Sequence, residues 1–344
     1  MPPPMQPYHK TKRGQMILGD SLEYMAALKS ESVDLIITSP PFGLVRKKDY
    51  GNVESHEYID WFKPFGREFR RILKSSGSLV IDIGGAWLPG QPTRSLYHFE
   101  LAVTLCREIG FYLAQEFFWW NPSKLPSPAE WVTVRRIRVK DAVNMVWWFS
   151  TTPWPKASNR RVLSPYSDAM RGLLKNGYKA KLRPSGHDIS KKFAWDNGAA
   201  IPPNLLAIPN TESNSYYLRY CQKNGIGVHP ARFPAALPEF FIRMLTDADD
   251  AVLDPFAGSC VAGEVCERLG RRWVCVENRE EYLRGAIGRF ERLPRPAQEK
   301  LFDTPPKEAS SYKLHHPAAL WNDHEDPLPA DGGKERVIRA RRRA

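Results

Sequence analysis

The segment Ser39-Pro40-Pro41-Phe42 places a hydroxyl, a rigid backbone and an aromatic ring directly after the apolar run 33–37. An amine on an aromatic ring is a poor nucleophile, because its lone pair is delocalised into the ring. The Ser39 hydroxyl and the Pro40 carbonyl are candidate acceptors for its two N–H bonds, since consecutive prolines hold the backbone extended. The Phe42 ring can stack on a nucleobase, which is worth ~1–3 kcal/mol. The segment predicts chemistry on an aromatic amine; an ordinary Ser-Pro-Pro turn is the alternative.

A second candidate site is the Gly258-Ser259 turn, which follows the apolar run 251–253 and Asp254. A Gly/Ser turn after a buried strand lets a ligand approach the backbone and points a helix N-terminus at it. The next apolar run ends in Glu277, where a carboxylate can accept both hydroxyls of a ribose. This series indicates a nucleoside cofactor, with an ordinary strand–helix–strand unit as the alternative. No GxxxxGK[ST] phosphate loop is present.

Alternating apolar runs and amphipathic stretches must position these two segments. Strands are predicted at 16–18, 33–38, 78–84, 117–120, 142–149, 252–254 and 273–277, and helices at 21–28, 58–73, 99–109, 237–245, 261–269 and 281–290. The helix at 21–28 is expected to be capped by Ser21, and the helix at 58–73 is expected to stop at Gly77. Alternation of this kind predicts an α/β fold with a doubly wound, mostly parallel sheet. Ligands of such sheets bind outside the carboxyl ends of the strands, so both segments are expected at one edge.

Composition limits the classes of partner. The chain has 344 residues with 50 Lys+Arg against 38 Asp+Glu, a net charge of +12, which favours nucleic acid over a membrane as partner. A merely basic protein is the alternative. Five cysteines form no CxxC pair and no disulfide framework, which favours a reducing cytoplasm, and no metal-ligand spacing is seen. No membrane span and no signal peptide are expected, because the apolar runs are shorter than the ~20 residues that a span needs.

Changes in composition predict five regions. They are a loose leader at 1–15, a catalytic half at 16–150, a basic module at 151–228, a cofactor-binding half at 229–293 and a Pro-rich basic tail at 294–344. The basic module is expected to be an insertion outside the sheet, since 151–200 holds ten Lys+Arg against three Asp and has weak periodicity. The tail is expected to be disordered.

Taken together, the two segments resemble those of the DNA methyltransferases that modify exocyclic amines. Ser39 resembles the N4-cytosine branch, whereas the N6-adenine branch typically carries Asp or Asn at that position. The order of the catalytic segment, the basic module and the cofactor segment matches the β group. The resemblance runs roughly from Gly19 to Phe290. It includes Arg46-Lys47-Lys48, Asn121-Pro122-Ser123-Lys124-Leu125-Pro126-Ser127-Pro128, Arg183-Pro184-Ser185-Gly186-His187-Asp188 and His229-Pro230-Ala231-Arg232-Phe233-Pro234.

The resemblance implies a seven-stranded, circularly permuted methyltransferase sheet that binds S-adenosylmethionine. It implies that Asp20 lies near the adenine, that Glu277 binds the ribose and that Phe233-Pro234 covers the methionine part of the cofactor. It also implies that the segment 39–42 holds a cytosine flipped out of the duplex. The remaining cofactor residues that it implies are Asp254, Phe256, Gly258 and Ser259.

The basic module 151–228 is the expected target-recognition region, whose Arg and Lys side chains would contact phosphates or guanine edges. For each of these side chains a solvated surface charge is the alternative. The candidate DNA-binding residues are Arg46, Lys47, Lys48, Lys124, Arg160, Arg161, Lys181, Arg183, Lys191 and Lys192. Trp119 and Trp120 form either a wall of the base pocket or part of the core. A second basic cluster at 135–140 is either a DNA contact or the exposed edge of a strand.

The predicted function is site-specific transfer of a methyl group from S-adenosylmethionine to cytosine N4 in double-stranded DNA by direct in-line attack. A restriction-modification system with a separate restriction endonuclease is the expected context, and neither a metal nor a membrane is expected to take part. The alternatives are N6-adenine methylation, methylation of RNA, and a DNA-binding regulator that does not catalyse transfer.

Overall fold

The computed structural model describes residues 5–43, 53–177, 195–210 and 215–291. Several predictions fall outside these described residues: the tail at 294–344 and the candidate DNA contacts Arg46, Lys47, Lys48, Lys181, Arg183, Lys191 and Lys192.

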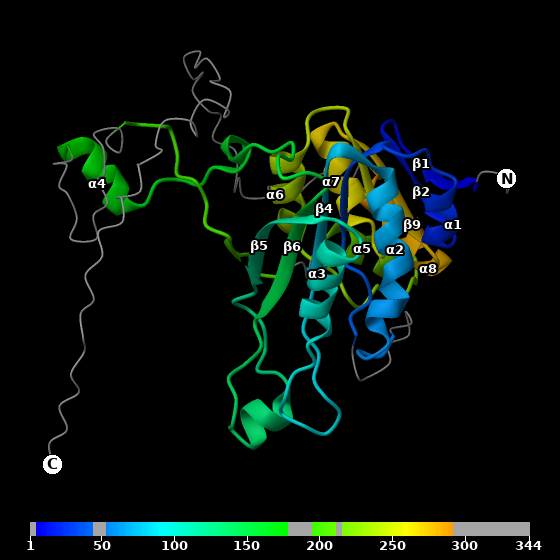
Figure 1. Cartoon of the computed structure of the whole chain (residues 1–344), viewed down its shortest axis with the longest axis horizontal. Helices are drawn as coiled ribbons and strands as arrows, with labels where there is room; N and C mark the ends of the chain where they lie inside the picture. The colour runs from blue at the N-terminus through cyan, green and yellow to red at the C-terminus, as the bar shows by residue number, and fades with distance from the viewer. Residues whose placement is uncertain (1–4, 44–52, 178–194, 211–214, 292–344) are drawn as a thin grey trace, which may run out of the picture. The chain divides into compact units, whose positions relative to one another are not determined.

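The described residues form a nine-stranded sheet with the order β1-β2-β9-β8-β3-β4-β6-β5-β7 (Figure 1). The strands are β1 (Pro7–Lys10), β2 (Gly14–Leu18), β3 (Val33–Thr38), β4 (Leu73–Ile83), β5 (Tyr112–Trp120), β6 (Val143–Ser150), β7 (Leu205–Ala207), β8 (Ala251–Asp254) and β9 (Arg272–Glu277). Among the strands of the described residues, only β1 and β6 run against the others, because they pair antiparallel with their neighbours. The predicted doubly wound, mostly parallel sheet is confirmed, with seven central strands and the short edge strands β1 and β7 added.

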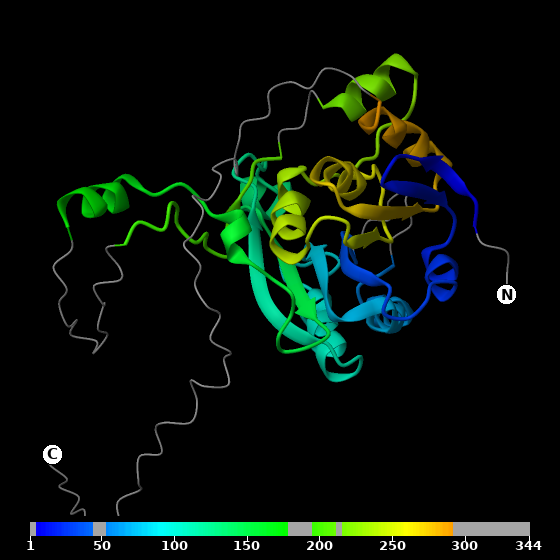
Figure 2. The ribbon, with the colours of Figure 1, turned by 90° about the horizontal axis from the view of Figure 1, so that it is seen from above.

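Helices cover both faces of the sheet (Figure 2). The helices α1 (Ser21–Ala26), α2 (Tyr58–Ile72) and α3 (Tyr97–Arg107) pack on one face, and α6 (Ala236–Leu245), α7 (Val261–Leu269) and α8 (Glu280–Ala286) on the other. The chain also forms α4 (Asp168–Asn176) and α5 (Tyr216–Lys223). Because side chains alternate along a strand, neighbours in β3 enter different cores: Leu35 packs with α6 and Ile36 with α2. Within the described residues, no helix is long and apolar enough to cross a membrane.

The N-terminal region is more ordered than its sequence predicts. Residues 1–15 were expected to be a loose leader, but Pro7–Lys10 forms β1 and pairs antiparallel with β2. Tyr8 packs against the core. The prediction was wrong because an edge strand is short, tolerates a proline as its first residue and carries little apolar alternation.

Three other local predictions need correction. The module 151–228 does not lie wholly outside the sheet, because Leu205–Ala207 pairs parallel with β5 as β7. Gly77 does not stop α2, which ends at Ile72 and leads directly into β4. Asp20, the residue before Ser21, caps α1 by accepting from two backbone N–H groups at 2.7 and 3.1 Å. A side-chain cap at the preceding residue satisfies the same orphan donors.

Strand direction defines two edges of the sheet. The carboxyl edge, where the parallel strands end, receives the residues that follow β3, β4, β5, β8 and β9. The opposite, amino edge receives the residues that follow β6, because β6 runs antiparallel to β4 with Ser78 opposite Ser150. The first part of the basic module therefore begins at the amino edge, where Lys156 forms ion pairs with Asp247 and Asp250 at 2.7 and 2.6 Å.

Candidate active site

The two segments singled out by sequence meet at the carboxyl edge. They follow neighbouring strands, since β3 pairs with β8 in parallel. The Thr38 hydroxyl donates to Asp254 Oδ1 over 2.7 Å, and this bond is buried. Asp254 also accepts from the backbone N–H of Phe256 at 3.2 Å. Burial raises the pKa of Asp254 to about 7, and the hydrogen bond from Thr38 opposes this rise. This link fixes the catalytic segment next to the candidate cofactor turn.

Ser39 lies beside a buried carboxylate that the sequence reading did not select. The Ser39 hydroxyl donates to Asp82 Oδ2 over 3.1 Å, and the Asn144 amide donates to Oδ1 of the same carboxylate over 3.1 Å. Burial raises the pKa of Asp82 to about 6, while the Asn144 and Ser39 hydrogen bonds and the positive charge of Lys124 oppose the rise. A carboxylate poised near neutral pH can take up a proton that reaches it through Ser39.

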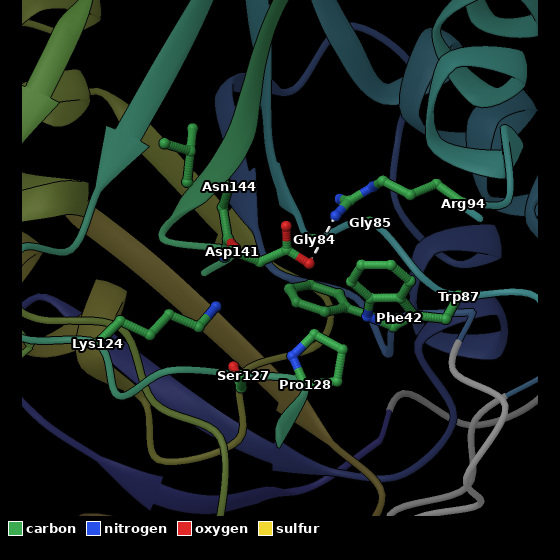
Figure 3. Close-up of a pocket in the computed structure, with 11 residues that line it drawn as sticks. Phe42, Gly84, Gly85, Trp87, Arg94, Lys124, Ser127, Pro128, Asp141 and Asn144 are labelled. Atoms are coloured by element: carbon green, nitrogen blue, oxygen red, sulfur yellow. Dashed lines mark ion pairs between the residues drawn. The ribbon is translucent and has the colours of Figure 1, made fainter. Parts of the chain in front are cut away.

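A cavity of about 260 Å³ opens beside Phe42 (Figure 3). This is below the ~300–1,000 Å³ of sites for drug-sized ligands and suits a single base. Lys124 and Pro128 face Phe42 across it in Figure 3. The lining residues are Phe42, Gly84, Gly85, Trp87, Arg94, Lys124, Ser127, Pro128, Asp141, Val143 and Asn144.

Phe42 owes its position to a glycine at the end of β4. A Cβ atom on Gly84 would lie 2.6 Å from the Phe42 ring, a distance that real side chains do not adopt. The bare backbone at Gly84 therefore lets the ring lie against the strand end. The Tyr97 hydroxyl donates to the Gly84 carbonyl and holds this backbone in place.

The cofactor end is built around Glu277. Its carboxylate accepts the backbone N–H of Gly258 at 2.8 Å and that of Arg279 at 3.0 Å. A carboxylate offers about four lone-pair positions, so acceptor capacity remains for a ribose. Burial raises the pKa of Glu277, and the backbone hydrogen bonds oppose the rise. The neighbouring strand β2 is followed by Gly19 and then Asp20. The Gly19 N–H donates to the Glu277 carbonyl at 3.0 Å, which places Asp20 near the end of β9.

The Gly258 turn forms a bare cradle. Gly258 has a φ of +50°, and a Cβ there would lie 3.0 Å from the His229 imidazole. Burial lowers the pKa of His229 to about 4, so this ring is neutral at physiological pH. Phe256 presents its ring between Phe65 and Trp61, with centroids 4.9 and 5.9 Å away. Together, a carboxylate that can accept hydrogen bonds, an aromatic ring and an open backbone turn fit a nucleoside cofactor.

The segment His229–Pro234 reaches this turn through His229. Its backbone N–H donates to the Tyr217 hydroxyl at 2.7 Å, and its ring contacts Tyr282 edge-on with centroids 4.4 Å apart. Phe233 is partly buried against the core and Pro234 is buried. The structure thus places this segment beside the cofactor turn, and the cover that Phe233-Pro234 would give the methionine part stays a prediction.

Two of the candidate residues form hydrogen bonds within the protein. The Ser259 hydroxyl and carbonyl accept hydrogen bonds from the Arg289 side chain at 3.2 and 2.6 Å. Arg289 therefore holds the Gly258-Ser259 turn to the last part of the α/β domain. Trp119 is a core residue: it is buried, and its indole N–H donates to the Ile208 carbonyl at 2.9 Å. Of the segment 119–124, Lys124 lines the cavity.

Arg160 and Arg161 lie at the amino edge, away from the cavity. They occupy a short 3-10 turn, Asn159–Val162, that packs against α6 through the buried Val162. Arg161 pairs with Asp247 at 2.5 Å and donates to the Thr246 carbonyl at 2.6 Å. Arg161 therefore ties this turn to the main domain. Sequence could not show this, because the position depends on β6 running antiparallel.

The sequence did not point to several residues at the end of β3, at the end of β4 and in the loop after it, and at the start of β6 and in the loop before it. They are Thr38, Asp82, Gly84, Trp87, Arg94, Asp141 and Asn144. One signal was available for Asp82: a carboxylate inside the apolar strand 78–83 is costly unless it is paired or functional.

Comparisons with known proteins agree with this geometry. A family model described as DNA methylase matches residues 33–288. The Type II methyltransferase M.PvuII of Proteus hauseri is 54% identical over 288 residues, which are 83% of this chain and 86% of that protein. A solved structure, the PvuII DNA methyltransferase (cytosine-N4-specific), matches with a TM-score of 0.69 and 48% identity, over 83% of this chain and 89% of that one.

More distant relatives share the fold. The DNA adenine methyltransferase YhdJ of Escherichia coli is 26% identical over 283 residues, 80% of this chain and 82% of that protein. The structure of a Thermus thermophilus DNA modification methylase complexed with S-adenosyl-L-methionine matches with a TM-score of 0.51 at 22% identity, over 81% of this chain and 93% of that one. Similarity at this level shows a common fold.

Proposed function

The chain belongs to the DNA methylase family, and from this membership we propose that it transfers a methyl group from S-adenosylmethionine to the exocyclic N4 amine of cytosine in duplex DNA. One observation supports the reaction most directly. Ser39 donates to the buried Asp82 carboxylate beside a cavity walled by Phe42, at the strand end that Thr38 ties to the cofactor turn.

The residues of the site activate the amine. The Ser39 hydroxyl donates to Asp82, so its oxygen lone pairs stay free to accept one N–H of the cytosine amine. The Pro40 carbonyl is the acceptor for the other. Two acceptors favour the sp³ geometry in which the nitrogen lone pair leaves the ring. Phe42 stacks on the base and holds its plane, which contributes ~1–3 kcal/mol.

S-adenosylmethionine, when bound, supplies an electrophilic methyl group on a sulfonium sulfur. The amine nitrogen forms the new C–N bond while the S–C bond breaks, and the electron pair of the broken bond stays on sulfur. The surplus proton on nitrogen passes to Ser39 as the hydroxyl proton of Ser39 moves to Asp82. Because the pKa of Asp82 is about 6, the carboxylate is ionised and able to accept at neutral pH.

Positioning supplies the rest of the rate. A donor and an acceptor held in line react as if at very high local concentration. The Thr38–Asp254 hydrogen bond joins the base-holding segment to the cofactor segment directly, and both strands are buried. Residues Asp254, Phe256, Gly258 and Glu277 would hold the cofactor at this place.

Cytosine is the favoured target for two reasons. The relatives that share 54% and 48% identity are named as M.PvuII and as cytosine-N4-specific, whereas the adenine methyltransferase shares 26%. The hydroxyl of Ser39, backed by Asp82, replaces the Asp or Asn of the adenine branch. The same two-acceptor arrangement suits an adenine amine, so the product must be identified chemically.

Comparing classes of nucleic acid tests this function. The purified chain would be incubated with labelled S-adenosylmethionine and matched duplex DNA, single-stranded DNA or RNA, and the nucleosides analysed by mass spectrometry. Label in N4-methylcytosine, highest with duplex DNA, is expected. Label in RNA alone would overturn the substrate class. DNA binding without label would indicate a regulator.

The cellular setting is also a proposal. The name of the M.PvuII relative, Type II methyltransferase, supports a restriction-modification system with a separate endonuclease. Five free cysteines suit the reducing cytoplasm. Recognition by the module 151–228 stays a prediction, as do its boundaries. Cleavage of unmodified but not of modified DNA by an extract of the source cells would support the endonuclease.

A further inference from the structure

Residues 121–142, here called the flanking arm, project from the carboxyl edge between β5 and β6 (Figure 1). Lys124, Ser127, Pro128 and Asp141 of the arm line the base cavity. The arm leaves the sheet at the end of β5 and returns at the start of β6. Its base is closed by the Asn121 N–H, which donates to the Ala142 carbonyl at 2.9 Å. The sequence alone allows two interpretations of the basic cluster at 135–140, a DNA contact or the exposed edge of a strand. It is not a strand, because Glu130–Val134 forms a helical turn and the chain is irregular from there to β6.

The flanking arm is tied to the loop 84–96 that follows β4. Arg94 pairs with Asp141 at 2.7 Å, and the Arg138 guanidinium lies 4.0 Å from the centre of the Trp87 ring. Arg138 also donates to the Pro92 carbonyl. Both segments line the cavity that Phe42 opens onto. A duplex that delivers a base into this cavity would therefore come close to these two segments.

The arm carries a surplus of positive charge. It holds five basic side chains against two acidic ones, a net charge of +3. The Arg135 side chain is 61% exposed and its guanidinium lies over the Trp131 ring. It also forms an ion pair with Glu130 at 3.2 Å. Arg136 is exposed, and among the described residues no ion pair involves it. Surface charge of this density favours a polyanion.

Apolar side chains alternate with the charges. Val134, Ile137 and Val139 are 74%, 59% and 85% exposed. Exposed apolar residues between arginines suit the mixed surface of a nucleic acid, whose sugars and unstacked bases are apolar and whose phosphates are charged. When a base flips out of the duplex, it leaves a gap in the base stack and exposes the apolar faces of the neighbouring bases.

The position of the arm separates it from the other basic residues. Arg160 and Arg161 lie at the amino edge, whereas the arm lies at the carboxyl edge with Ser39. A flipped nucleotide remains joined to its own strand, so the phosphates next to it must lie close to the cavity. The arm is thus the described basic surface that those phosphates would meet.

We propose that the flanking arm binds the DNA backbone beside the flipped cytosine, with Arg135 and Arg136 on phosphates and with Ile137 and Val139 against the opened stack. This inference rests on the proposed DNA methyltransferase function. It assigns a duplex contact outside the module 151–228.

The test compares two double variants that each lose two positive charges. Arg135→Ala/Arg136→Ala removes the arm charges. Arg67→Ala/Arg107→Ala is the control, because both residues are exposed and lie on α2 and α3. Binding of a labelled mixed-sequence duplex is measured by anisotropy at several salt concentrations, with S-adenosylhomocysteine present.

The arm variant is expected to bind about tenfold or more weakly and to lower the salt slope by about 1.8, at ~0.9 per phosphate contact. The control should keep the slope of the wild type, and S-adenosylhomocysteine affinity should stay unchanged in both. Ile137→Ser/Val139→Ser should weaken binding without changing the slope. Equal DNA affinity and slope in the arm variant and the control would overturn the proposal.

Two outcomes keep this inference separate from the function. Methylation of duplex DNA by the wild type, with DNA binding unaffected in the arm variant, would refute the arm and leave the enzyme standing. Loss of binding to anionic phospholipid vesicles, with unchanged DNA affinity, would assign the arm to a lipid surface instead and so overturn the proposal.

Discussion

The Ser39 hydroxyl donates a hydrogen bond to the Asp82 carboxylate, with 3.1 Å between Oγ and Oδ2. Strand register explains the contact: Thr38 on β3 pairs with Ile81 on β4, so the residues that follow both lie at the carboxyl edge as neighbours. Asn144 approaches the same carboxylate from β6. Three strands therefore build one acceptor for the proton that leaves the amine.

Replacing Ser39 by Ala should slow transfer while leaving binding intact. The variant removes the acceptor of one N–H bond and the path to Asp82, and general acid–base groups contribute roughly 10²–10⁴-fold to rate. Single-turnover methylation should fall within this range. Dissociation constants for DNA and cofactor, measured on the same preparation, should stay within about threefold. Full activity would remove Ser39 from the mechanism.

Asp82→Asn should produce a loss similar to that of Ser39→Ala, and the double variant should lose little more. Groups that act as one unit are not additive, because removing either one already breaks the relay. The cycle is read from single-turnover rates of the four proteins. Losses that simply multiply in the double variant would show that the two residues act independently.

The pH dependence of kcat/KM should carry the titration of Asp82. Burial raises the pKa of Asp82 to about 6, so the group is protonated and unable to accept below that pH and ionised above it. The rate should fall on the acid side of about pH 6 in the wild type, and Asp82→Asn should lose this limb. Lys124→Met should move the limb to higher pH, because the Lys124 charge lowers the pKa of Asp82. A limb that Asp82→Asn leaves unchanged belongs to another group.

Gly84→Ala should weaken capture of the base. Its Cβ would lie 2.6 Å from the Phe42 ring and displace it. Loss of a stack worth ~1–3 kcal/mol corresponds to roughly 5–150-fold in kcat/KM. Fluorescence of 2-aminopurine at the target position reports flipping directly. An unchanged signal in Gly84→Ala would show that the ring can adjust.

Asp254 should make the free protein less stable as pH rises. Its pKa is raised from 3.8 to about 7, so the folded state favours the protonated carboxyl; that stability is present below the unfolded pKa and is lost as pH rises through about 7. Asn stays neutral and can accept the same two hydrogen bonds. The Tm of Asp254→Asn minus that of the wild type should therefore increase from about pH 4 to about pH 8. A constant difference would contradict the shifted pKa.

Sequence identified the strand ends but could not pair them. The apolar runs before Ser39 and before Asp254 are long and buried, so their edge of the sheet followed from the pattern. Asp82 lies 43 residues from Ser39 and becomes its neighbour only through the order β3–β4. The location of Arg161 could not be predicted for the complementary reason, since the antiparallel β6 carries the chain to the opposite edge. Edge strands such as β1 bury too few side chains to give a periodic signal.

The most direct test of the account is nucleoside mass spectrometry of duplex DNA after incubation with the chain and S-adenosylmethionine. The wild type should form N4-methylcytosine, and Ser39→Ala/Asp82→Asn, under the same conditions, should form nearly none. N6-methyladenine in place of N4-methylcytosine, or undiminished N4-methylcytosine from the double variant, would contradict the assignment of the Ser39–Asp82 site to this chemistry.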